Sequence, residues 1–181
     1  FLEWAATVSE PVSDEQRAEI EAALVPCFRR MITGERSPAP GLQYYEVVTM
    51  GRLRLGIGSA LDEKYLIRVR GPSADPDDDV ILELKEVRDL SGIPCIDGSS
   101  RVDPFRILVG QARLAYTPYV HLGYLRLRGR TLWVHGWVMN YRELDVSATD
   151  REPADLAEVI FDVGGQLGRG HPNQIATPMD A

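Results

Sequence analysis

Short stretches in which polar and apolar residues alternate constrain the fold of this chain more than any other feature. Residues 52–55 read Arg-Leu-Arg-Leu, and residues 65–70 alternate in the same manner. A period of two is typical of a β-strand with one buried face. A bend that contains glycine, Gly56-Ile57-Gly58-Ser59, separates the two stretches. Residues 44–70 are therefore predicted to form a β-hairpin around this bend.

Further strands and one helix are predicted downstream of the hairpin. Residues 80–87, with the sequence VILELKEV, predict a third strand, and residues 121–128 and 131–139 predict two more, joined by a tight turn. Between the third and fourth predicted strands, Asp103-Pro104 is a favourable start for a helix over residues 103–116. Strands joined by short turns pair in an antiparallel manner. The chain is therefore predicted to be α+β, with an antiparallel five-stranded sheet and one packed helix.

Helical segments flank the predicted sheet in the sequence. Residues 1–34 are predicted to be helical, with Ser13 as an N-cap, and to form the end of a preceding helical region. The central domain is predicted over residues 42–171, and its last helix over residues 150–169. Residues 172–181 are predicted to be a disordered tail.

Charge and cysteine content narrow the classes of function. The 181 residues carry a net charge of −7, which disfavours a general nucleic-acid-binding surface and adsorption on anionic membranes. No apolar run approaches the roughly 20 residues that a transmembrane helix needs. Cys27 and Cys95 are the only cysteines and make no disulfide framework. We therefore expect reduced thiols in a cytoplasmic protein, without nucleic-acid or membrane partners.

The order of the predicted elements resembles that of a protein-kinase-like small lobe. In such lobes a glycine-bearing bend joins the first two strands and covers nucleotide phosphates, which a lysine on the third strand also reaches. More specifically, the chain resembles a bacterial family known as domain of unknown function 2252, a distant relative of the aminoglycoside phosphotransferases. The matching stretches are residues 54–71, 80–87, 106–114 and 167–171, and the resemblance covers about residues 42–171.

The resemblance implies a set of nucleotide-binding residues. Gly56, Gly58 and Ser59 belong to the bend that would cover phosphate, because glycine lets backbone amides approach a ligand closely. Lys85 is the third-strand lysine that would hold phosphate. Gln111 lies on the helix that, in kinases, supplies the partner of this lysine. The implied ligand is ATP with magnesium.

The same residues also have simpler interpretations. The bend is equally typical of a hairpin turn, and Gln111 of a polar helix surface. Strand alternation places Lys85 beside Glu83, on the face opposite Leu82 and Leu84, where a solvated ion pair would contribute little. The acidic run over residues 75–79 fits no recognised calcium loop and is predicted to be a solvated loop.

Two functions stay open. The first is the nucleotide-binding lobe of a kinase-like phosphotransferase with an unknown substrate. The sequence contains no His-x-x-Asn loop and no Asp-rich metal motif, so no catalytic or metal-binding residue is assigned. The missing catalytic half is then expected in the same protein or in another chain. The second is a non-enzymatic binding or scaffold domain, which is favoured by Ala60-Leu61 and His135-Gly136, where the resembling family carries other residues.

Overall fold

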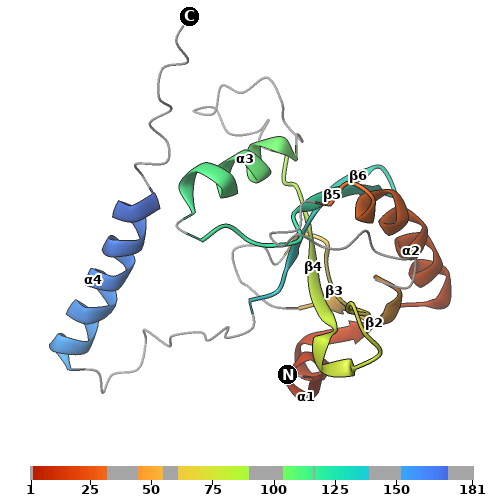
Figure 1. Cartoon of the computed structure of the whole chain (residues 1–181), viewed down its shortest axis with the longest axis horizontal. Coiled ribbons are helices and arrows are strands. Elements are labelled where there is room, and N and C mark those ends of the chain that lie inside the picture. Colours follow the sequence, from red (N-terminus) through yellow and green to blue (C-terminus); the bar gives the residue numbers. More distant parts are fainter. Residues whose placement is uncertain are drawn as a thin grey trace, which may run out of the picture. The chain divides into compact units, whose positions relative to one another are not determined.

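The structure is a computed structural model, and it describes residues 2–31, 45–54, 61–89, 104–115, 117–138 and 152–170. The elements in chain order (Figure 1) are α1 (Leu2–Val8), β1 (Ser9–Pro11), α2 (Asp14–Phe28), β2 (Val47–Leu53), β3 (Lys64–Val69), the 3-10 turn η2 (Pro76–Asp78), β4 (Val80–Glu86), α3 (Phe105–Leu114), β5 (Gly123–Leu127), β6 (Arg130–Gly136) and α4 (Pro153–Gly170). The chain divides into two compact units, residues 1–105 with 119–137, and residues 106–118 with 138–181.

The first unit is built on one antiparallel sheet. Its six strands have the order β1-β2-β3-β4-β6-β5, and every neighbouring pair is antiparallel. The α+β class and the antiparallel sheet are thus confirmed, and β2 with β3 forms the predicted hairpin. The predicted tight turn between β5 and β6 is also present. Arg128 and Gly129 there have positive φ values of 48° and 78°, which suit the right-handed twist of a two-residue hairpin.

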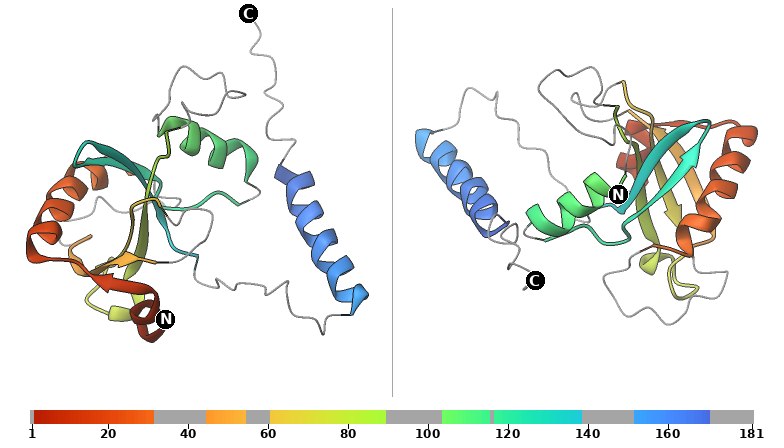
Figure 2. Two further views of the ribbon diagram at one scale, coloured as in Figure 1. Left: turned by 180° about the vertical axis from the view of Figure 1, so that it is seen from behind. Right: turned by 90° about the horizontal axis from the view of Figure 1, so that it is seen from above.

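The core lies between α2 and one face of the sheet, and the right-hand view of Figure 2 shows α2 along this face. Ser13 caps α2 as predicted, because its hydroxyl accepts a hydrogen bond from the Gln16 backbone N–H at 3.2 Å. This capping box fixes the start of the helix. The apolar residues of α2 and the inward residues of four strands form a single cluster: Ile20, Leu24, Cys27, Tyr65, Ile67, Val69, Leu82, Leu84, Leu125, Leu127, Leu132 and Val134.

The N-terminal segment differs from the prediction. Residues 1–34 were predicted to be a helical segment with Ser13 as an N-cap, but α1 and α2 are separated by the strand β1, which raises the number of strands from five to six. β1 pairs with residues 51–53 of β2, and Gly51 makes this approach possible. A Cβ atom at position 51 would lie 2.8 Å from the Ser9 hydroxyl oxygen. Pairing with a distant strand therefore overrides the local helical tendency.

Both predicted downstream helices are present in the second unit. α3 corresponds to the helix predicted over residues 103–116, and α4 to the one predicted over residues 150–169. The predicted linker at residues 35–41 and the predicted tail at residues 172–181 lie outside the described residues.

Candidate functional site

The face of the sheet opposite α2 carries one row of side chains across four strands. Lys64 of β3 is directly opposite Lys85 of β4, and Lys85 is opposite Trp133 of β6. Trp133 is in turn opposite Tyr124 of β5. Side chains that are directly opposite one another in antiparallel strands have Cβ atoms roughly 4.5–5.5 Å apart. We call Lys64, Lys85, Trp133 and Tyr124 the lysine row.

The two lysines of this row are the only lysines in the sequence, which contains 18 arginines. Arginine supplies the cations of the surface ion pairs, as in Arg54–Glu10 and Arg70–Glu46. Lysine, in contrast, occurs only where two ammonium groups are opposite each other. Like charges at directly opposite positions are destabilising. The arrangement therefore concentrates positive charge at one place on the sheet at a cost in stability.

Burial increases this cost at Lys64. Its residue surface is 3% exposed. Burial, and then the neighbouring Lys85 ammonium, lower the pKa of Lys64 from its ordinary value, while the carboxylates of Glu83 and Asp62 act in the opposite direction. The charged form of Lys64 is thus less favourable in the folded protein than in water. An anion placed between the two lysines would restore it.

Lys85 is half-buried. Strand alternation correctly placed it opposite the face of Leu82 and Leu84, which both belong to the core. Within the part of the chain that the structure describes, Lys85 makes no hydrogen bond and no ion pair. Glu83 contacts the imidazole ring of His135 and not Lys85, so the alternative of a Glu83–Lys85 ion pair is wrong. Lys85 thus contributes a second positive charge to the lysine row.

Glu83 of β4 and His135 of β6 are directly opposite each other in the row next to the lysine row, and their side chains are in contact. The Nε2 atom of His135 lies 3.1 Å from a carboxylate oxygen of Glu83, and its Nδ1 atom lies 2.9 Å from the carbonyl oxygen of Gly136. Both ring nitrogens thus face acceptors. A neutral imidazole carries one N–H and donates to only one of them, whereas the protonated ring donates to both.

Aromatic rings surround His135 and hold it in place. The ring centre of Trp133 lies 4.4 Å from that of His135, with 26° between the planes, and the ring centre of Tyr119 lies 4.2 Å away. His135 is 4% exposed. Trp133 and His135 therefore form a buried stack beside the lysines, on the face opposite the main core.

Two of the five predicted site residues belong to the part of the chain that the structure describes. Lys85 lies in the lysine row, and Gln111 lies on α3, in the second unit, where it is half-buried. Gly56, Gly58 and Ser59 lie outside the described residues. Sequence reasoning missed Lys64. Two signals could have found it, namely that it is one of two lysines and that the alternation of β3, continued one step back from Leu66, places it on the same face.

The acidic run at residues 75–79 has structural roles. The Asp75 side chain accepts a hydrogen bond from the Asp77 backbone N–H at 3.0 Å and caps the turn η2. Asp79 pairs with Arg68 at 2.6 Å and also accepts a hydrogen bond from the Gly71 backbone N–H at 3.3 Å. Most of this charge is thus used to shape the loop between β3 and β4.

Among the described residues, no group of three or more His, Cys, Asp or Glu side chains is placed to hold a metal ion. In the same ranges, no helix combines the length and the apolar character that crossing a membrane requires. Comparison of the chain with protein-family models, with curated proteins and with solved structures found no match.

Proposed function

We propose that the lysine row binds the phosphate groups of a nucleotide and that the chain is the nucleotide-binding lobe of a kinase-like phosphotransferase. The observation that carries this proposal is the opposition of Lys64 and Lys85 in the β3–β4 pair. Two ammonium groups on directly opposite residues repel each other, and a phosphate between them would replace this repulsion by two charge-assisted hydrogen bonds.

The connection between β2 and β3 supports this assignment. β2 ends at Leu53 and β3 begins at Lys64, so the chain leaves and re-enters the sheet beside the lysine row. The glycines of the bend, Gly56 and Gly58, belong to this connection. A lysine side chain reaches roughly 6 Å from its backbone. In the proposed site, the ammonium of Lys85 would hold phosphate, and the glycine bend would cover it.

The order of the elements also supports a kinase-like lobe. Two strands joined by the glycine bend are followed by a third strand with Lys85, by helix α3 and by the β5–β6 hairpin. This is the sequence of elements that kinase-like small lobes use to position a phosphate-binding lysine. We propose ATP with magnesium as the ligand. The metal ligands and the catalytic base would come from a catalytic half in the same protein or in another chain, because the sequence contains no His-x-x-Asn loop and no Asp-rich metal motif.

A non-enzymatic binding or scaffold domain is the second candidate, and one observation favours it. Glu83 and His135 pair beside the lysines, and the rings of Trp133 and Tyr119 cover His135. This packing fills the face next to the lysine row with protein side chains. In a scaffold domain, Glu83 would neutralise part of the positive charge, and no nucleotide would be needed.

Acylation of the lysines separates the two candidates. An amine-reactive ester modifies Lys64, Lys85 and the terminal amine, since the chain has no other lysine, and mass spectrometry quantifies each site. A nucleotide-binding lobe is expected to show slower acylation of Lys85 with ATP, and with inorganic triphosphate, than without ligand. Adenosine should give no protection of the lysine. Unchanged acylation with all three compounds would contradict nucleotide binding and leave the scaffold domain.

Calorimetry of variants gives the matched control. Lys85→Met is expected to weaken ATP binding by about 1–3 kcal/mol, the usual cost of losing a charge-assisted contact. Arg126→Met removes one exposed positive charge from β5, at a position that alternation places on the same face, and is expected to have a much smaller effect. Equal losses in the two variants would mean that ATP responds only to net charge.

A further inference from the structure

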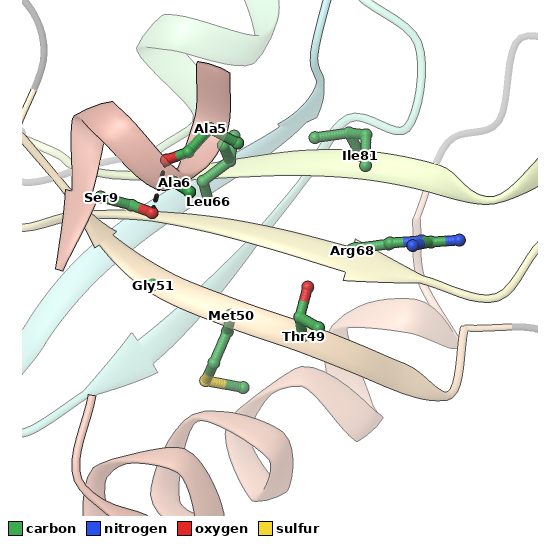
Figure 3. A pocket seen from close by; sticks show the side chains of 9 residues that line it. All are labelled: Ala5, Ala6, Ser9, Thr49, Met50, Gly51, Leu66, Arg68 and Ile81. Carbon is green, nitrogen blue, oxygen red and sulfur yellow. Dashed lines mark hydrogen bonds between the residues drawn. The ribbon is translucent and has the colours of Figure 1, made fainter. Parts of the chain in front are cut away.

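A pocket of about 320 Å³ lies between α1 and the strands β2, β3 and β4, on the face opposite α2. Figure 3 shows α1 above the strands, with the side chains of Leu66 and Thr49 directed toward the pocket and that of Met50 directed to the other side. The volume falls at the lower end of the range of about 300–1,000 Å³ that is typical of small-molecule sites.

Small residues create this space. α1 contributes Ala5 and Ala6 to the lining, and β2 contributes Gly51. The hydroxyl of Ser9 donates a hydrogen bond to the carbonyl oxygen of Ala5 at 2.7 Å, so this side chain folds back onto α1. Leu66 and Arg68 line the pocket from β3, and Ile81 lines it from β4. A larger side chain on α1 would fill the volume, and close packing is the rule in protein interiors.

Two contacts hold α1 at this distance from the strands. The Trp4 and Trp137 rings are 5.5 Å apart, which fixes α1 to the end of β6. The short strand β1 follows α1 directly, and its residues 9–11 pair with β2. The helix is thus attached at both ends, and the space beneath it is a feature of the fold.

The polar groups of the lining indicate which molecules fit. Arg68 is the one charged residue in the lining, and its charge is already matched by Asp79 at 2.6 Å, whose side chain is 4% exposed. Among the described residues, the Thr49 hydroxyl has no hydrogen-bond partner. Ala5, Leu66 and other apolar side chains form most of the remaining wall. A charged ligand would therefore lose hydration without gaining a counter-charge.

We infer that this pocket binds a small neutral molecule, mainly apolar, with one carbonyl or hydroxyl group that hydrogen-bonds to Thr49. This site is separate from the proposed phosphate site, and neither depends on the other. The pocket is lined by Leu66, whereas the lysine row contains Lys64, two residues earlier on β3. Two residues of a strand span roughly 7 Å.

Methyl NMR of the full chain tests the inference with cyclohexanone and cyclohexanol as probes. The methyl signals of Ala5, Leu66 and Ile81 are expected to shift in a saturable manner with either probe, while that of Ala18 on the exposed side of α2 stays unchanged. Cyclohexanecarboxylate and cyclohexylammonium, which have the same ring and a charge, are expected to bind at least about tenfold more weakly. Equal binding of the charged compounds, or no shift with the neutral ones, would overturn it.

Two variants define the place and the polar contact. Ala5→Leu fills the pocket and is expected to abolish binding, while Ala18→Leu on α2 leaves binding intact. The near-ultraviolet dichroism of the Trp4–Trp137 pair reports whether α1 stays in place in Ala5→Leu. Thr49→Val keeps the shape and removes the hydroxyl, so cyclohexanol should bind up to about tenfold more weakly. Unchanged affinity in both Ala5→Leu and Thr49→Val would place the probe elsewhere and refute the inference.

Discussion

Replacing Lys64 by methionine should make the protein more stable and, at the same time, a poorer binder of phosphate. Methionine preserves most of the length of the side chain, which is 3% exposed, and removes its charge. The two ammonium groups of the lysine row are on directly opposite residues. At a separation of about 6 Å and an effective dielectric constant of about 20, two unit charges repel by roughly 3 kcal/mol.

The net gain is smaller than this repulsion. Glu83 and Asp62 attract the Lys64 charge and offset part of it. We therefore expect Lys64→Met to raise the free energy of unfolding by about 1–2 kcal/mol at neutral pH and low salt, because the substitution removes both the desolvation cost of a buried charge and its repulsion from Lys85. Urea denaturation with an unchanged slope measures this difference. The double variant Lys64→Met, Lys85→Met should gain less than the sum of the single variants, because the repulsion is removed only once.

The pH dependence has a definite sign. The folded protein lowers the pKa of Lys64 below the ordinary lysine value of 10.5. Between the lowered pKa and 10.5, the unfolded chain therefore binds more protons than the folded one, and stability attributable to Lys64 rises with pH. This rise should be absent in Lys64→Met. A variant that is less stable than the wild type with an unchanged slope, or that keeps the same rise, would refute the reasoning about the lysine row.

Two further predictions concern burial. Asp79→Ala leaves Arg68, whose side chain is 17% exposed, without its partner at 2.6 Å, and should lower the free energy of unfolding in urea by about 3–5 kcal/mol. Glu46→Ala breaks the exposed pair with Arg70 and should lower it by at most about 1 kcal/mol, so similar losses in the two variants would show that burial does not distinguish the pairs. Burial also raises the pKa of the Cys27 thiol to about 11. A thiol reagent should therefore modify this residue at pH 8 only as fast as the protein unfolds. Rapid modification of the native protein would contradict the burial of Cys27.

The sequence predicted those features of the fold that depend on local patterns. Alternation located β2, β3 and β4 and assigned Lys85 to the face opposite Leu84, because the strand period alone determines these features. The preference of serine for the N-cap position predicted the start of α2 at Ser13. In each case neighbouring residues carry the whole signal.

Pairing between strands that are distant in the sequence could not be predicted from local patterns. β1 consists of Ser9, Glu10 and Pro11, which show no periodicity and become a strand only because β2 lies beside them. The opposition of Lys64 and Lys85 depends on the register of β3 and β4. The loop between these strands is closed by a hydrogen bond from the Gly71 backbone N–H to Asp79. The sequence position of one lysine therefore does not reveal that the other lysine lies opposite it.

The strand β1 lies at one edge of the sheet and covers the backbone groups of β2 there. It covers the outer edge of β2 and is itself only three residues long, from Ser9 to Pro11. Proline has no backbone N–H, so β1 presents a poor template for another strand. In a chain that begins at residue 12, the backbone groups of residues 51–53 would lose their pairing with β1 and become exposed. Loss of a short N-terminal segment would thus convert a protected margin of the sheet into a surface for intermolecular β-pairing and aggregation.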